Sequence, residues 1–179
     1  PISQLADTNR TKEWKPKEQI FNKVTYVINK NNLKINNYFE NFYEKITNLG
    51  KPKEPYFENA FDEYYYTSRT NLATNISFNN KNDKVKIMLA YNKYKREKET
   101  YYTDLTTLEK TLLINSSAQD TSEFDLIIGK ITMSNNQNSK FKYQTGVDLQ
   151  KQTAKGKRIL NNYQSQDNYA FFSFFEYNP

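Results

Sequence analysis

The side chains that most often carry out catalysis near neutral pH are missing from this chain of 179 residues, which contains no histidine and no cysteine. Without histidine, no side chain has an unperturbed pKa near neutrality. Without cysteine, there is no thiolate nucleophile, no disulfide and no redox motif. Metal ligands are restricted to oxygen, which favours Ca²⁺ or Mg²⁺ over transition metals. We therefore expect no thiol, histidine or transition-metal chemistry, and no cofactor.

The carboxylates leave two kinds of chemistry to consider. Asp120, Glu123 and Asp125 form the only local acidic cluster, but it lacks the alternating spacing and the turn glycine of a calcium loop. A solvated loop is the favoured interpretation, and no metal site is expected. A glycosidase needs two carboxylates that face each other across a cleft, and nothing in the sequence places two of them so. The candidates for such a pair are Asp62, Glu63, Glu97, Glu99 and Asp125.

Motifs for phosphate binding and serine catalysis give no better support for an enzyme. A phosphate-binding loop needs several glycines in one turn, whereas the four glycines here are scattered along the chain. The nucleophile-elbow pattern GxSxG is absent from the sequence. We therefore expect a protein that is not an enzyme, with a carboxylate-dependent hydrolase kept as an alternative.

The most suggestive segment is residues 91–102, which read YNKYKREKETYY and interleave rings with cations. Rings stack on bases and cations neutralise phosphates, so this composition suits nucleic acid or an anionic wall polymer. Two acids in the segment, Glu97 and Glu99, weaken the attraction to phosphate. The alternative is a charged strand end that resists edge pairing. The candidate binding residues are Tyr91, Lys93, Tyr94, Lys95, Arg96, Lys98, Tyr101 and Tyr102.

The overall composition indicates a folded chain with a polar surface. The net charge is +6, the mean hydropathy is −0.96, and aromatic residues make up 16% of the chain. Low hydropathy alone would favour disorder, but disordered segments are poor in rings. Rings bury large areas and can supply a core. No run of 18 apolar residues exists, so we expect no transmembrane segment.

The elements that must position these residues fall into two halves. In the first half, apolar residues recur at helical spacing over 17–30, 34–49 and 55–68. Gly50 and Pro52 suit the end of the second of these helices. Residues 104–114 are interpreted as a short helix that crosses between strands.

In the second half, the hydrophobic period changes to two. Residues 84–91 and 141–150 alternate apolar and polar side chains, which predicts half-buried antiparallel strands. Residues 124–133 and 168–177 are apolar on both faces and are also predicted to be strands, and 73–79 is a weaker one. The stretch 151–167 is expected to be a long polar loop.

This order of elements predicts an α+β fold, with N-terminal amphipathic helices packed on a C-terminal antiparallel sheet that can be strongly curved and cone-like. In element order alone it is similar to NTF2-like cone folds, including the periplasmic assembly domains of type IV secretion systems. The expected organisation is a polar arm over 1–16, with Trp14 tucked against the body, and one α+β domain over 17–179. Within that domain, the helical part covers about 17–68 and the β part about 73–178.

These inferences favour a non-catalytic binding or assembly module that is extracytoplasmic or part of the cell envelope of an AT-rich bacterium or mobile element. A secretion or conjugation component is one example. The expected partner is a protein or a second copy of the chain, with an anionic polymer as the other option. The alternatives are a basic nucleic-acid-binding module and the carboxylate-dependent hydrolase, and a cytoplasmic location is the alternative to the envelope.

Overall fold

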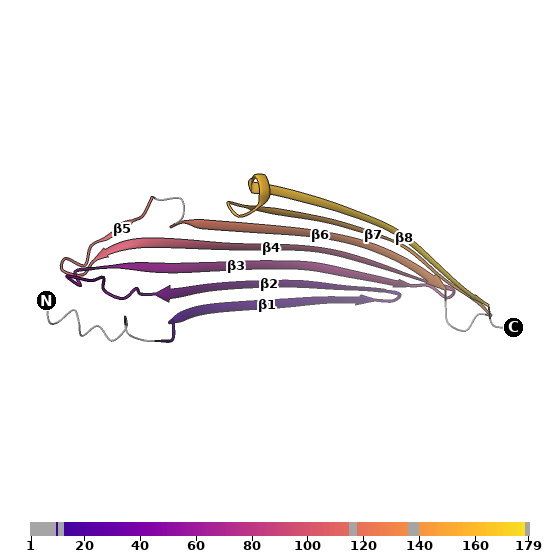
Figure 1. Cartoon of the computed structure of the whole chain (residues 1–179). Coiled ribbons are helices and arrows are strands. Elements are labelled where there is room, and N and C mark those ends of the chain that lie inside the picture. The colour runs from indigo at the N-terminus through magenta and orange to yellow at the C-terminus, as the bar shows by residue number, and fades with distance from the viewer. Residues whose placement is uncertain (1–9, 11–12, 115–117, 136–139, 178–179) are drawn as a thin grey trace.

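The computed structural model describes residues 10, 13–114, 118–135 and 140–177. This part of the chain forms one curved layer of antiparallel strands (Figure 1). Each long strand pairs with the next long strand along the chain, and the short β5 pairs with the end of β4. The strands are β1 (Lys17–Lys30), β2 (Leu33–Asn48), β3 (Asn59–Asn79), β4 (Asp83–Asp104), β5 (Lys110–Leu112), β6 (Asp120–Asn135), β7 (Phe141–Gly156) and β8 (Tyr163–Tyr177).

The predicted α+β fold is therefore wrong, because the segments predicted as N-terminal helices are strands. Residues 17–30 form β1, residues 34–48 lie in β2, and 55–68 divides between the connection 49–58 and β3. The predicted helix over 104–114 is instead a turn followed by β5. Within the described residues, the only helical element is a single 3-10 turn, η1, at Leu160–Asn162.

The helical spacing in β2 has a simple explanation in the sheet. Ile35 and Phe39 lie on one face, whereas Phe42 and Ile46 lie on the other, because successive strand residues alternate in direction. The apolar side chains thus change face partway along the strand. Because Phe39 and Phe42 are three residues apart and lie on opposite faces, the apolar residues of β2 follow one another at intervals of three and four. One stripe of a helix has the same intervals.

The predicted strands of the second half are confirmed as parts of an antiparallel sheet. Residues 84–91, 124–133, 141–150 and 168–177 all lie within long strands. The long loop expected over 151–167 is wrong, because β7 runs to Gly156 and only residues 157–162 connect it to β8. Trp14 was expected to tuck against the body, yet its side chain is 61% exposed. Most of the arm at 1–16 lies outside the described residues.

The two ends of the sheet differ in their connections (Figure 1). At one end, β1–β2, β3–β4 and β6–β7 are joined through 31–32, 80–82 and 136–140. At the other end, longer segments join β2 to β3 and β4 to β6, and residues 157–162 join β7 to β8. We refer to these as the short-turn end and the long-connection end.

The strands are much longer than the five or six residues typical of globular sheets. β3 and β4 contain 21 and 22 residues, which corresponds to about 70 Å of extended chain. Because the sheet has no second layer over it among the described residues, few side chains are buried there. The buried hydrophobic residues of that part are Ala60 and Leu105.

No helix in the described ranges is long and apolar enough to cross a membrane.

Candidate functional site

The basic and aromatic segment 91–102 lies entirely within β4, so its side chains alternate between the two faces of the sheet. It therefore does not form one surface. The eight candidate binding residues divide into Tyr91, Lys93, Lys95 and Tyr101 on one face and Tyr94, Arg96, Lys98 and Tyr102 on the other.

Two residues of the first half, Lys95 and Tyr91, are in contact with carboxylates of β4 and β6 on the same face. Lys95 Nζ lies 2.6 Å from a carboxylate oxygen of Glu97 and 3.9 Å from one of Glu123. The Tyr91 hydroxyl donates a hydrogen bond of 2.9 Å to Asp125. These contacts neutralise charge on this face and favour a structural role for this half.

Three residues of the second half, Tyr94, Arg96 and Lys98, line a pocket with a volume of about 390 Å³, whereas the Tyr102 ring contacts Phe61. The strand register brings residues far apart in the sequence to the pocket wall, from β3, β4, β6 and the connection between β7 and β8. The pocket is lined by Tyr65, Tyr94, Arg96, Lys98, Asp120, Ser122, Phe124 and Arg158.

Rings and cations are interleaved in this pocket. The Arg96 guanidinium lies 5.4 Å from the centre of the Tyr65 ring, and Lys98 Nζ lies 5.9 Å from it. The rings of Tyr94 and Phe124 are 6.1 Å apart and tilted by 48°. Such an arrangement offers both flat apolar surfaces and positive charge to a ligand.

Two of the three cations in the pocket are paired with carboxylates. Lys98 Nζ lies 2.6 Å from Glu63, and Arg158 Nε lies 2.9 Å from Asp120 Oδ2. The hydrogen bond and the charge of Glu63 raise the pKa of Lys98 above its ordinary value. Arg96 is the cation that remains directed at the pocket with an aromatic ring as its neighbour.

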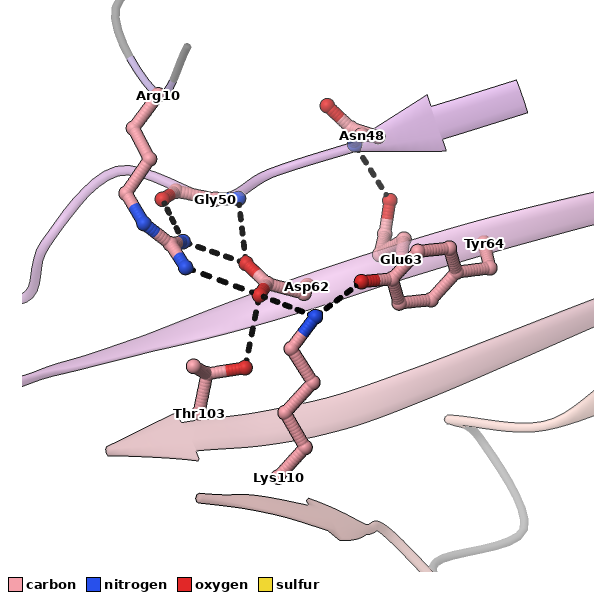
Figure 2. Close-up of polar contacts among 8 residues, drawn as sticks. All are labelled: Arg10, Asn48, Gly50, Asp62, Glu63, Tyr64, Thr103 and Lys110. Carbon is pink, nitrogen blue, oxygen red and sulfur yellow. Dashed lines mark hydrogen bonds and ion pairs between the residues drawn. The ribbon is translucent and has the colours of Figure 1, made fainter. Parts of the chain in front are cut away.

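A second polar cluster surrounds Asp62 at the long-connection end of the sheet (Figure 2). Arg10 Nη1 and Nη2 donate to the two oxygens of Asp62 at 2.5 and 3.0 Å. Thr103 Oγ1 donates at 2.8 Å and the Gly50 backbone N–H at 3.2 Å, while Lys110 Nζ lies 4.0 Å away. Asp62 thus joins Arg10 to the connection 49–58 and to the ends of β3 and β4.

The electrostatics of Asp62 favour a structural role, in which it stabilises this end of the sheet, over a catalytic role. Burial alone would raise its pKa, but the hydrogen bonds from Arg10 and Thr103 and the charge of Arg10 outweigh burial, so the pKa lies below its ordinary value. A carboxylate that is fully hydrogen-bonded and has a lowered pKa is a poor general acid or base at neutral pH.

The other acids considered for hydrolysis also have nearby partners. Asp62 and Glu63 point to opposite faces of β3, and Glu63 accepts hydrogen bonds from Asn48 and Tyr65. Glu99 accepts a hydrogen bond from the Tyr101 hydroxyl. Across the described residues, no group of three acids is arranged to hold a metal ion.

The apolar side chains of the sheet form a band on one face. One row crosses all seven long strands through residues that are hydrogen-bonded neighbours and all apolar. This face, which also carries Tyr91 and Lys93, is called the apolar face below. Its central row consists of Ile28, Ile35, Ile76, Ile87, Ile131, Val147 and Phe171.

The opposite face, called the polar face below, carries polar and charged side chains in the row that adjoins the central apolar row. The row next to the isoleucines runs through Val27, Asn36, Asn75, Met88, Lys130, Asp148 and Ala170. Lys130 and Asp148 form an ion pair of 3.4 Å in its middle. The sheet therefore has one face suited to an apolar environment and one suited to water.

Sequence reasoning missed most of the pocket and all of the Asp62 cluster. It found Tyr94, Arg96 and Lys98 because they lie in one continuous segment. The partners Tyr65, Phe124 and Arg158 come from other strands, and only the register places them beside β4. The sequence signal for the two faces was the alternation of apolar and polar residues along each strand. In the first half of the chain, the apolar spacing was interpreted as helical, and that interpretation is wrong.

An open single-layer antiparallel meander of long strands is the class of fold that the chain adopts. No protein-family model and no curated protein matches the chain. Among solved structures, it is similar to BauA, the ferric preacinetobactin receptor from Acinetobacter baumannii, with a TM-score of 0.50 and 7% identity. That similarity covers 88% of this chain and 27% of BauA.

A second similar structure is the ferric citrate transporter FecA in its unliganded form. The TM-score is 0.44 with 9% identity, over 89% of this chain and 24% of FecA. The chain thus spans about a quarter of the length of these two proteins. At these identities the likeness concerns the fold.

Proposed function

We propose that the chain is a non-catalytic assembly module of the cell envelope, whose apolar face lies against the hydrocarbon of a lipid bilayer. The observation that carries this proposal is the apolar band, in which seven neighbouring strands present apolar side chains in one unbroken row. Many side chains of the row and of the band around it are exposed: Ile131 is 51% exposed, Leu89 53% and Phe171 75%. An apolar surface of this extent on a protein marks an interaction site.

The height of the band suits a bilayer. On β4 it runs from Val85 to Tyr91, and on β7 from Phe141 to Leu149, with Tyr143 and Thr145 as its polar members. Seven to nine strand residues correspond to about 20–27 Å. Strand proteins in membranes present an apolar band of about 25 Å.

The borders of the band also fit this environment. On the long-connection side, Phe39 and Tyr91 lie in the last row that is apolar from β1 to β6, which continues through Lys151 on β7 and Asp167 on β8. The next row is polar on every strand. Aromatic side chains at the edge of an apolar band are typical of the boundary between lipid and water. That polar row consists of Asn22, Asn41, Thr70, Lys93, Asp125, Thr153 and Ser165.

The two edges of the sheet explain why we call the chain an assembly module. In the described structure, β1 and β8 each have a long strand on one side only. Backbone groups in hydrocarbon must be hydrogen-bonded, since each unsatisfied group costs several kcal/mol. The edges must therefore pair with strands from a second copy or from another polypeptide segment. BauA is described as a receptor, which supports a binding role more than a catalytic one.

The test compares two adjacent positions on β4 that lie on opposite faces. In a Trp14→Phe background, which removes the only tryptophan, Leu89→Trp places a fluorophore on the apolar face and Met88→Trp places one on the polar face. The full chain is reconstituted into phosphatidylcholine vesicles whose acyl chains carry bromine. We expect strong quenching of the Leu89→Trp variant and weak quenching of the Met88→Trp variant.

Two results would contradict the proposal. Equal quenching at both positions would show that the faces do not differ in their access to lipid. Absence of quenching at Leu89→Trp, together with a fluorescence change that depends on protein concentration, would show that a second copy covers the band in place of lipid.

A further inference from the structure

We propose that the pocket on the polar face binds an acidic sugar, that is, a hydroxyl-bearing ring that carries a carboxylate or a phosphate group. The pocket comprises the eight lining residues given above, including Tyr65, Arg96 and Asp120. It lies on the face opposite the apolar band and nearer the long-connection end. The inference therefore goes beyond contact with lipid and does not depend on it.

The size and lining of the pocket suit a small organic ligand. A volume of about 390 Å³ lies within the range of small-molecule sites, which are usually concave and combine apolar surface with a few placed polar groups. Here the strand register supplies the apolar surface from Tyr65, Tyr94 and Phe124 and the polar groups from β4, β6 and the connection 157–162.

Charge points to an anionic group on the ligand. Lys98 is paired with Glu63, and Arg158 with Asp120. No carboxylate of the described residues forms an ion pair with Arg96, whose guanidinium lies beside the Tyr65 ring. A guanidinium can bind a carboxylate or phosphate through two parallel hydrogen bonds, and ring contact on one face leaves its edge available for them.

The aromatic side chains point to a ring on the ligand. Tyr94 and Phe124 are register partners whose ring centres are 6.1 Å apart with planes tilted by 48°, so together they form one bent aromatic surface along the pocket. The apolar C–H surface of a sugar ring can pack on such a surface, since aromatic side chains offer broad apolar faces.

Asp120 points to a hydroxyl donor on the ligand. Its Oδ2 is paired with Arg158, but its Oδ1 is buried and accepts no hydrogen bond from the described part of the chain. A buried acceptor without a donor is unfavourable. If the Asp120 carboxylate rotates so that Oδ1 faces the pocket, a ligand hydroxyl supplies that donor, and a hydroxylated anion therefore fits better than a simple one. A nucleic-acid strand fits less well, because only one cation here is without a carboxylate partner.

The test measures binding of three probes to the full chain by saturation-transfer NMR and by titration. The probes are glucuronate, which has ring, hydroxyls and carboxylate, glucose, which lacks the charge, and inorganic phosphate, which lacks the ring. We expect glucuronate to bind at least about tenfold more tightly than either of the others, since a charge-assisted hydrogen bond contributes about 1.5–3 kcal/mol.

Two variants on the same strand separate a site from general attraction to a basic protein. Arg96→Gln removes the proposed anion partner on the polar face, and Lys93→Gln removes the same charge from the apolar face three residues away. We expect Arg96→Gln to weaken glucuronate binding at least about tenfold and Lys93→Gln to leave it nearly unchanged. The proposal is overturned if the two variants lose equal affinity, if glucose binds as well as glucuronate, or if glucuronate shows no saturable binding.

Discussion

At the scale of single residues, the Asp62 carboxylate accepts four hydrogen bonds. Its carboxylate receives a bidentate pair from Arg10, a hydroxyl from Thr103 and a backbone N–H from Gly50. Asp62 and Arg10 are both buried, with side-chain exposures of 0% and 7%. In a sheet with so little buried surface, this ion pair fixes Arg10 to the long-connection end.

Replacing Asp62 should therefore destabilise the protein. Asp62→Asn keeps the shape of the side chain but removes the buried negative charge that pairs with Arg10. Breaking a buried ion pair in this way costs about 3–5 kcal/mol. The free energy of unfolding from a urea titration measures the loss. The matched control is Glu63→Gln, on the same strand but half-buried, which should cost at most about 1 kcal/mol. Equal losses in the two variants would refute the special role of Asp62.

The contribution of Asp62 should also depend on pH in a defined direction. Its pKa in the folded protein lies below the ordinary value of 3.8. A lowered folded pKa gives stability that is complete above the unfolded pKa and lost as the pH falls through the folded pKa. We expect the difference in unfolding free energy between wild type and Asp62→Asn to be constant from neutral pH to about pH 5 and to shrink below about pH 4. A difference that grows on acidification would contradict this sign.

At the scale of the elements, the close pairing of β6, β7 and β8 depends on Gly146 of β7 more than on Gly129 of β6. A Cβ added at Gly146 on β7 would come within 2.5 Å of the Ile131 carbonyl oxygen and 2.5 Å of the Phe172 ring. At Gly129 on β6, the nearest atom would be Leu89 Cδ2 at 3.7 Å, an ordinary contact. Phe172 thus occupies the space that a side chain at Gly146 would need.

Alanine substitutions at these two glycines should have different effects. Gly146→Ala forces Phe172 and the backbone of β6 to move, and overpacking of this kind costs about 1–3 kcal/mol. Gly129→Ala meets no close atom and removes flexibility from the unfolded chain, so it should be neutral or stabilising by up to about 1 kcal/mol. Thermal unfolding of both variants measures the contrast. A destabilised Gly129→Ala with an unaffected Gly146→Ala would show that the described packing of these strands is wrong.

At the scale of the whole molecule, the sheet resembles one wall of a larger structure, with an apolar face, a polar face and two open edges. Apolar patches and unpaired strand edges both promote association in water. The same apolar face is favourable in hydrocarbon. A charged substitution on the apolar face should therefore be unfavourable for the protein in lipid, but it should reduce self-association in water.

A pair of lysines on the apolar face tests this reversal. Ile87→Lys with Ile131→Lys changes neighbouring residues of the central row, and Asn75→Lys with Met88→Lys changes neighbours at the same height on the polar face. Lysine at the bilayer midplane costs about 2–4 kcal/mol. The first pair should weaken partition into phosphatidylcholine vesicles by at least about thirtyfold. It should also reduce the oligomer size found by light scattering in lipid-free buffer.

The control pair should change neither quantity strongly, because it introduces the same charges into a face that already carries Lys130 and Asp148. Similar losses of partition in both double variants would show that added charge, and not the identity of the face, governs the interaction with lipid.

The sequence by itself determined the chemistry that is absent and much of the second half of the fold. The lack of histidine and cysteine excludes their chemistry whatever the fold is. The strict alternation in 84–91 and 141–150 predicts strands, because residues two apart share a face. The tertiary structure alone decided the first half, since the apolar residues of β2 change face along the strand and imitate a helix. It also decided the pocket and the Asp62 cluster, because both depend on which residues of distant strands lie in the same row of the sheet.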